Sequence, residues 1–354
     1  MSLFAARLLA WFDRHGRHDL PWQHPRSAYR VWISEVMLQQ TRVGAVVPYF
    51  QAFMRRFPDV PALAEAPLDE VLHLWSGLGY YARARNLHRA ARLVLERHGG
   101  ELPADRTALE TLPGIGRSTA AAVLAQAHGQ REAILDGNVR RVLARHAAIE
   151  GWPGSPAVQK QLWALAEALL PEARMADYTQ AIMDLGAAVC TRAQPACQRC
   201  PVAPDCAALA QGRTAELPTP RPGRALPLRT RWAALVVAPE GVYLQRRVAA
   251  GIWGGLYSMP EADEKQDLRD AILSRWTEAR EDAPDAGDRI DHAFSHYRLD
   301  LRILRFRLPA AACGIMEGEG SIWYNTRLPV RVGLPAPIER FLRDRGNIEN
   351  GANR

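Results

Sequence analysis

The sequence contains no uninterrupted apolar stretch of the roughly 20 residues that a membrane-spanning helix needs. It also has no internal repeat and no low-complexity segment. The N-terminal stretch is not followed by a small-residue cleavage site, and its Asp13 and the histidines after it fit an amphipathic surface helix better than a signal peptide. We therefore expect a soluble cytoplasmic protein.

Lysine is scarce, because the 45 basic residues are nearly all arginine; they outnumber the 38 acidic residues and give a formal net charge of +7. Guanidinium groups form bidentate hydrogen bonds with phosphates, so this excess favours a polyanionic partner such as nucleic acid, although charge alone does not establish one. Hydrophobic residues make up 48% and charged residues 23%, which rules out a disordered or fibrous chain. A length of 354 residues suits two domains.

Cysteines are few, but four of the five lie within 17 residues in the pattern C-x6-C-x2-C-x5-C. These four are Cys190, Cys197, Cys200 and Cys206. Such close spacing in a cytosolic chain favours a metal site over disulfides, and both zinc and a [4Fe–4S] cluster accept four thiolates. One compact, asymmetric run favours the cluster, with zinc and a disulfide knot as the alternatives. Cys313 stands alone in an apolar stretch, where we expect a buried small hydrophobic residue.

Apolar spacings of three and four residues predict a helical domain over residues 1–212. The expected helices cover residues 3–12, 29–44, 82–97, 117–127, 137–145, 158–170 and 176–189. Three prolines within five residues then predict a stiff, exposed linker at 213–230. Beyond it we expect strands at 232–238, 242–246 and 297–308 and helices at 264–278 and 336–345. Residues 231–346 are therefore predicted to be a separate α+β domain, with a tail at 347–354.

The segment LPGIGRSTA, residues 112–120, lies between two helical patterns. Pro113 ends the first helix, and Gly114 and Gly116 permit a sharp turn. Gly116 leads directly into the next helix beside Arg117, so free backbone N–H groups there can attract an anionic phosphate. The alternative is an ordinary helix–helix turn. The segment resembles a helix-hairpin-helix DNA-binding element, expected at about residues 109–127.

Two carboxyl groups are candidates for chemistry. Glu35 is surrounded in sequence by Trp32, Ile33, Val36 and other apolar residues, which tends to raise a carboxyl pKa and keep the group protonated. Asp136 stands where a helix N-cap belongs, and a helix N-terminus favours its negative charge. Taken alone, Glu35 could be a solvated helix glutamate and Asp136 a capping residue.

Two further motifs are SEVMLQQT at residues 34–41 and LWSGLGYY at 74–81. Together with the hairpin, Asp136 and the four cysteines, they resemble the endonuclease III-like superfamily of DNA glycosylases, and within it the MutY-type adenine glycosylases. The motifs recur in order over residues 20–206, and the second domain also fits.

The resemblance implies a multidomain fold: an all-α helix-hairpin-helix glycosylase domain with an iron–sulfur cluster loop at residues 190–206, and an α+β Nudix-like C-terminal domain. It also implies a [4Fe–4S] cofactor held by the four cysteines. The expected partner is double-stranded DNA in which adenine is mispaired with 8-oxoguanine or guanine. We expect a monomer that acts at the nucleoid.

Two features discriminate within the superfamily. Bifunctional glycosylase/lyases carry a lysine after the hairpin, whereas here the matching residue is Ser118, and the guanidinium of its neighbour Arg117 cannot form a Schiff base. A monofunctional, hydrolytic enzyme is expected. The C-terminal domain also lacks the clustered glutamates of a catalytic Nudix box, since Glu261, Glu264 and Asp270 are scattered, so we interpret it as a recognition domain.

Cleavage of the bond to adenine requires a proton for the leaving base and negative charge near the cationic sugar. The resemblance assigns Glu35 as the acid that protonates adenine N7 and Asp136 as the carboxylate that stabilises the sugar cation. In some relatives a tyrosine occupies the Ser118 position. The hydroxyl that remains here could hydrogen-bond to these carboxylates.

Adenine must leave the duplex to be reached. By resemblance, Gln40 and Tyr80 fill the gap and hold the orphaned partner base, and Leu78 adds apolar contact. The adenine pocket is expected to be lined by Trp22, Gln23 and Gln180, with Asp184 either beside it or structural. Trp22 could alternatively serve only the core.

The second domain contains the sequence His292-Ala-Phe-Ser-His296, which resembles the family's Phe-Ser-His recognition loop. We assign Phe294 as an apolar wedge and Ser295 and His296 as polar groups that read 8-oxoguanine. The alternative places Phe294 in the core and His296 on the surface.

Two other functions compete with this one. An endonuclease III-like pyrimidine glycosylase/lyase is disfavoured by Ser118 and by the second domain. A catalytically silent DNA-lesion binder is disfavoured by the presence of both Glu35 and Asp136.

Overall fold

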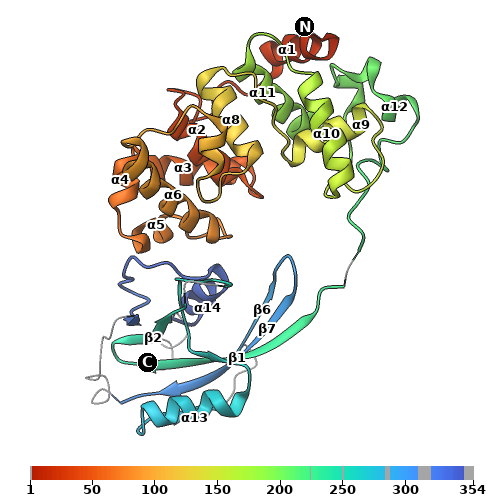
Figure 1. The fold of residues 1–354 in the computed structure, drawn as a ribbon. Coiled ribbons are helices and arrows are strands. Elements are labelled where there is room, and N and C mark those ends of the chain that lie inside the picture. The colour runs from red at the N-terminus through yellow and green to blue at the C-terminus, as the bar shows by residue number, and fades with distance from the viewer. Residues whose placement is uncertain (1, 224, 249–250, 284–287, 310–319, 347–354) are drawn as a thin grey trace. The chain divides into compact units, whose positions relative to one another are not determined.

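The computed structural model describes residues 2–223, 225–248, 251–283, 288–309 and 320–346 (Figure 1). Cys313 and the tail at 347–354 lie outside the described residues. The chain divides into two compact units. The first consists of Met1–Glu65 and Asn86–Gly223, and the second of Ala66–Arg85 and Arg224–Arg354.

Helices joined by loops make up the chain as far as Ala210, as the apolar spacing predicted. The longer ones are α1 (Leu3–His15), α2 (Ala28–Leu38), α3 (Val43–Arg56), α6 (Ala82–His98), α8 (Arg117–His128), α9 (Gly137–His146), α10 (Pro156–Ala168) and α11 (Met175–Asp184). The shorter ones are α4 (Val60–Glu65), α5 (Leu68–Leu74), α7 (Arg106–Glu110), η1 (Leu185–Val189), η2 (Cys197–Arg199), η3 (Ala203–Asp205) and α12 (Ala207–Ala210). No helix in the described parts of the chain is long and apolar enough to cross a membrane.

Two expected helices differ from the prediction. The helix expected at 29–44 is interrupted, because α2 ends at Leu38 and Gln40 adopts a left-handed backbone conformation with φ 61° before α3 begins at Val43. The helix expected at 176–189 changes type, since α11 ends at Asp184 and continues as the π-helix η1 up to Cys190. Single π-turns of this kind often occur at functional sites.

The largest apolar cluster of the helical unit joins α1, α8, α9, α10 and α11. Its fully buried members include Leu8, Ala121, Leu143, Leu162 and Leu185. The second helix of the hairpin, α8, packs against α2, α7 and α11, so elements that carry the predicted site residues meet on one helix. A rigid core behind these elements can hold reactive side chains in fixed positions.

The C-terminal part of the chain is a mixed sheet with helices, in agreement with the predicted α+β domain. Its described strands are β1 (Leu228–Ala238), β2 (Gly241–Arg246), β3 (Tyr257–Ser258), β4 (Glu261–Ala262), β5 (Arg280–Glu281), β6 (Arg289–Ala293), β7 (Arg298–Arg307) and β8 (Ser321–Tyr324). Strand order is β3-β2-β1-β7-β5, while β4, β6 and β8 pair with β1, β7 and β2. The β1–β7 pair is parallel and the other pairs are antiparallel.

Helices α13 (Lys265–Arg275) and α14 (Ala336–Gly346) lie on the two sides of this sheet (Figure 1). One apolar cluster joins Leu299, Leu301 and Ile303 to residues of α14, and another joins Leu304 and Phe306 to α13. Strand β7 therefore contributes to cores on both faces. This explains why its apolar residues alternate only in part, since a strand that is covered on both faces does not need alternation.

Candidate active site

Glu35 lies near the C-terminal end of α2, between Ser34 and Val36, which are almost completely buried. Burial is the main cause that raises its pKa to about 7, and repulsion by Asp136 acts in the same direction. A hydrogen bond from Gln126 acts in the opposite direction. The group is therefore poised to hold a proton near neutral pH, which is the property that a general acid needs.

Asp136 is the N-cap of α9, and its Oδ1 accepts the backbone N–H of Val139 at 2.7 Å. Burial raises the pKa of Asp136 above its ordinary value, and the backbone N–H groups of Val139 and Asn138 oppose this effect, as do Arg141 and Arg140. The N-cap predicted from the sequence is confirmed. Its carboxylate is stabilised by the helix N-terminus but is less exposed than a simple cap.

Ser118 lies in the first turn of α8, and its Oγ accepts the backbone N–H of Leu135 at 3.0 Å. Among the described residues it makes no hydrogen bond to Glu35 or Asp136. Its hydroxyl instead anchors the segment that leads directly into Asp136. Ser118 is therefore linked to Asp136 through the backbone and not by a direct contact of its hydroxyl.

Gln126 was not singled out from the sequence. It is 4% exposed on α8, and its Nε2 donates to Glu35 Oε1 at 3.2 Å. Glu35 and Gln126 are 91 residues apart in the chain, so only the packing of α2 against α8 brings them together.

A second polar network joins the chain before α2 to α11. The buried carboxylate of Asp184 accepts the Arg17 backbone N–H at 2.7 Å, Arg17 Nε at 2.8 Å and Gln180 Nε2 at 2.7 Å. Gln23 Nε2 donates to the Arg17 carbonyl at 3.1 Å. Asp184 is thus structural in this network. Gln180 Oε1 is buried without a hydrogen-bond partner among the described residues.

The other pocket residue predicted from the sequence, Trp22, is 3% exposed and packs edge-on against Phe50 with ring centroids 5.4 Å apart. Its ring is part of the packed interior. Contact with a base by Trp22 or Gln23 stays a prediction.

The hairpin connects α7 to α8. Gly114 has φ 81°, and a Cβ there would lie 2.9 Å from Asn86 Cβ, so the turn requires glycine. Gly116 is the N-cap of α8, and a Cβ at this position would meet open space. Arg117 forms an ion pair with Glu167 and lies 3.9 Å over the Trp163 ring. The exposed N-terminus of α8 therefore offers free backbone N–H groups, while the Arg117 side chain is engaged on α10.

Gln40 and Tyr80, which were predicted to fill the gap left by the flipped adenine, share an unusual backbone conformation. Gln40 has φ 61° and is exposed; Tyr80 has φ 47° and is 51% exposed. Left-handed conformations are costly for residues other than glycine and cluster at functional sites. Leu78, in the same loop as Tyr80, is 6% exposed, so it supports the loop from below the surface.

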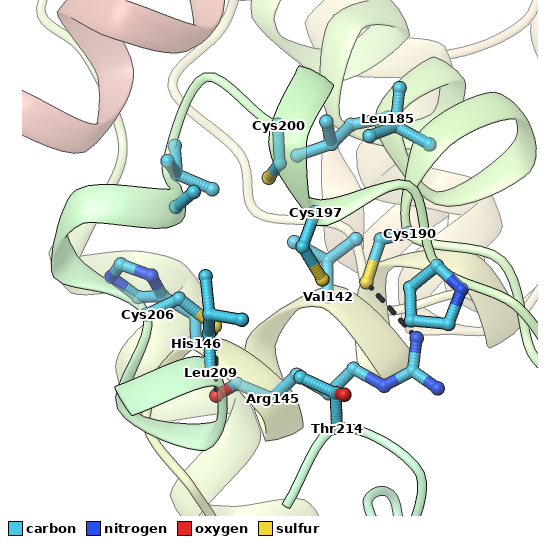
Figure 2. Close-up of a pocket in the computed structure, with 14 residues that line it drawn as sticks. Val142, Arg145, His146, Leu185, Cys190, Cys197, Cys200, Cys206, Leu209 and Thr214 are labelled. Carbon is cyan, nitrogen blue, oxygen red and sulfur yellow. Dashed lines mark hydrogen bonds between the residues drawn. The ribbon is translucent and has the colours of Figure 1, made fainter. Parts of the chain in front are cut away.

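The four cysteines of the predicted metal site line one cavity of about 400 Å³, which includes space open to solvent (Figure 2). Its other lining residues are largely apolar and include Val142, Leu185 and Leu209. All four thiols are free, so the disulfide alternative does not match the structure. Burial is the main cause that raises the pKa of Cys200 to about 11; the Val202 N–H opposes it, and the neighbouring cysteines add smaller increases.

The four cysteine side chains lie around this one cavity (Figure 2). No group of three or more His, Cys, Asp or Glu among the described residues is arranged to hold a single metal ion. Four thiolates around one largely apolar cavity are the donor set that a [4Fe–4S] cluster requires.

Two arginines of α9 bind the cysteine loop, and the sequence analysis missed both. Arg145 is 2% exposed and donates to Cys190 Sγ at 3.4 Å, to the Thr191 carbonyl at 2.7 Å and to the Leu217 carbonyl at 2.7 Å (Figure 2). Arg141 donates to the Cys190 carbonyl at 2.6 Å. The helix that Asp136 caps is therefore also the helix that secures the cysteine loop.

In the sheet unit, the turn between β6 and β7 is closed by a hydrogen bond from the Phe294 N–H to the Tyr297 carbonyl at 2.8 Å. Ser295 and His296 are exposed at its tip. Phe294 is half-buried, with its ring centroid 5.3 Å from Trp253 and 4.8 Å from Tyr297. The turn offers two polar side chains, whereas Phe294 is held by neighbouring aromatic rings.

The glycine hairpin between α7 and α8, Glu35 on the neighbouring α2 and Asp136 at the start of α9 all lie in a stretch that a DNA-glycosylase family model matches. The family model described as "HhH-GPD superfamily base excision DNA repair protein" matches residues 33–168, and that of the NUDIX domain matches residues 231–344. A solved thermostable thymine-DNA glycosylase is 30% identical with a TM-score of 0.53, over 59% of this chain and 96% of that one. An endonuclease III–DNA complex, 22% identical with a TM-score of 0.51, shares the fold.

Among curated proteins, the adenine DNA glycosylase of Buchnera aphidicola subsp. Acyrthosiphon pisum is 34% identical over 97% of both chains. The human adenine DNA glycosylase is 46% identical over 59% of this chain and 40% of its own length. The chain belongs to the adenine DNA glycosylase family. It is a base-excision-repair DNA glycosylase, a hydrolase that acts on N-glycosyl bonds. The fold predicted from the sequence, a helical glycosylase domain followed by a Nudix-like domain, is confirmed.

Proposed function

We propose that this enzyme flips adenine out of double-stranded DNA and hydrolyses its N-glycosidic bond where adenine is paired with 8-oxoguanine or guanine. One observation carries the proposal. Glu35, whose pKa is raised to about 7, lies close enough to Asp136, at the N-terminus of α9, for the two carboxyl groups to repel each other. The names of the curated relatives support adenine as the base.

Glu35 protonates N7 of adenine, so that the base leaves as a neutral molecule rather than as an anion. Asp136, ionised, stabilises the positive charge that develops on the sugar. Ionised after the transfer, Glu35 directs the attacking water. Gln180 Oε1, a buried acceptor fixed by the bond from Gln180 Nε2 to Asp184, suits the exocyclic amino group of adenine.

The same site supports a monofunctional enzyme. A lyase step requires an amine that attacks the sugar, and the position after the hairpin is Ser118, whose Oγ is bonded to the Leu135 N–H. The two lysines of the chain are elsewhere, since Lys160 lies on α10 and Lys265 begins α13.

DNA contacts are assigned to the hairpin and to exposed loop residues. The N–H groups after Gly114 and Gly116 bind a backbone phosphate, with Arg117 beside them. Gln40 and Tyr80 enter the gap left by the flipped adenine, since both are exposed. Ser295 and His296 read the partner base, and Phe294 supports them from the aromatic cluster.

The cysteine cavity is proposed to hold a [4Fe–4S] cluster with Cys190, Cys197, Cys200 and Cys206 as ligands. When bound, the cluster supplies a cross-link that keeps the loop at 190–206 in one conformation. Arg145 and Arg141 attach this loop to α9. The enzyme is proposed to act as a monomer.

Single-turnover adenine release from duplexes containing A:8-oxoguanine, A:G and A:T tests the proposal. We expect release from the first two pairs and little from A:T, with a rate that falls above pH 7 as Glu35 ionises. Thymine or another pyrimidine as the released base would overturn the assignment of the substrate. Binding to the mispairs without any base release would instead establish a lesion-binding protein.

A further inference from the structure

Gln126 is the one side chain that forms a hydrogen bond with Glu35 among the described residues, and none of the predicted roles involves it. Its Nε2 donates to Glu35 Oε1 at 3.2 Å from a site on α8 that is almost completely buried. Gln126 Oε1 is buried too and has no hydrogen-bond partner. Burying an amide whose oxygen has no hydrogen-bond partner costs free energy. We therefore expect the hydrogen bond that its Nε2 donates to Glu35 to have a function.

The direction of this hydrogen bond follows from the cost of burial. As it stands, the amide leaves its acceptor oxygen and one of its two N–H groups unpaired. An amide rotated by half a turn would leave an NH2 group with two donors buried and unpaired, and buried donors without partners are the rarer and costlier case. The arrangement with Nε2 toward Glu35 is therefore favoured.

A neutral carboxylic acid has one oxygen that accepts hydrogen bonds as a carbonyl and one that carries the proton. Glu35 Oε1 accepts the N–H of Gln126. Oε2 accepts no hydrogen bond within the described chain, and the side chain keeps partial exposure. We infer that Gln126 is a positioning residue that places the catalytic proton of Glu35 on Oε2, the oxygen left open for the base.

This inference rests on the proposed function, in which Glu35 is the acid. Gln126 does not touch the base; it acts through Glu35 by removing the alternative in which the proton sits on Oε1 and points into α8. The charged group that acts on Glu35 is Asp136, before α9, and its partner from α8 is the neutral amide of Gln126. Loss of the Gln126 N–H removes the one contact that favours the carboxylate.

The test is Gln126→Met, which keeps the length of the side chain and removes the donor. The readout is the single-turnover rate of adenine release from A:8-oxoguanine DNA across pH 5 to 9. We expect the rate on the acidic plateau of the pH–rate profile to fall about tenfold, the factor that corresponds to one hydrogen bond of ordinary strength. We also expect the alkaline limb of the profile, where the rate falls as Glu35 ionises, to move to higher pH. The matched control is Gln159→Met on α10, which removes an amide bonded to the Gly154 carbonyl and should leave both quantities unchanged.

A merely structural role for Gln126 would lower the rate without moving the alkaline limb, and that result would overturn the inference. An unchanged rate and an unchanged limb would overturn it as well. If the methionine variant does not fold, as judged by circular dichroism, Gln126→Asn withdraws the amide by one methylene and is expected to give the same two changes.

The Glu35→Gln background separates this inference from the proposed function. If Gln126 acts only through Glu35, Gln126→Met should cause no further loss of the residual rate in Glu35→Gln. A further tenfold loss there would assign Gln126 a role independent of Glu35 and refute the inference. A Glu35→Gln enzyme that retains full activity would refute the proposed function itself.

Discussion

Glu35→Gln should change activity and stability in opposite directions. The amide has nearly the same shape as the protonated carboxyl but cannot donate a proton as an acid does. One general acid contributes roughly 10²–10⁴ in rate, so adenine release should fall by that factor while duplex binding is kept.

The stability gain follows from the pKa of Glu35, which burial raises from 4.5 to about 7. Each pKa unit corresponds to about 1.4 kcal/mol, so the ionised carboxylate costs the folded protein at most about 3.5 kcal/mol. Below pH 4.5 the group is protonated in both the folded and the unfolded chain, and the cost is absent. It grows as the pH rises and is complete above pH 7, so the neutral glutamine should stabilise the protein there.

The assay combines single-turnover kinetics with urea unfolding at pH 4.5 and pH 8.5. The variant should have an unfolding free energy close to that of the wild type at the lower pH and a higher one at pH 8.5. Glu172→Gln is the matched control, because that side chain is 77% exposed and should show no such difference. Adenine release within tenfold of the wild type would show that Glu35 is not the acid, and equal stability at pH 8.5 would refute its burial.

Three further predictions concern the other parts of the account. Cys200→Ser should weaken DNA binding more than chemistry on bound substrate, and wild-type protein should be brown with about four iron atoms per chain; stoichiometric zinc without iron would contradict the cluster. Ser118→Lys should give partial strand cleavage and a borohydride-trapped protein–DNA adduct despite losing the bond to the Leu135 N–H, and no adduct with intact base release would mean that residue 118 does not face the sugar. Ser295→Ala with His296→Ala should reduce the preference for A:8-oxoguanine over A:G by about 1–3 kcal/mol, whereas equal loss on both substrates would indicate general DNA binding.

Much of the helical unit could be predicted from its apolar spacing, because helices such as α1 and α10 bury one face. The spacing does not reveal α3, which contains Pro48 and follows the left-handed residue Gln40 directly after α2. A left-handed conformation at a glutamine depends on surrounding contacts rather than on local preference, so the sequence alone does not indicate where the helix breaks.

The two candidate carboxyl groups stand in recognisable local settings, an apolar helix and an N-cap, but their roles were assigned by the resemblance to a known family and not by those settings alone. Their partners were not predicted, because the contacts that define them are long-range. Gln126 lies 91 residues from Glu35, and Arg145 lies 45 residues from Cys190. The direction of the pKa shift of Asp136 was also not predicted. A helix N-terminus alone would lower this pKa, whereas burial raises it.

The most direct test of the central claim is a product analysis of one turnover on an A:8-oxoguanine duplex, in which the released base is identified by mass spectrometry and the strand is examined before and after alkali. The account predicts free adenine and an abasic strand that stays intact until alkali is added, because Glu35 and Asp136 cleave the glycosidic bond and Ser118 provides no amine. Release of a different base, or a strand that is cut without alkali and trapped by borohydride, would contradict it.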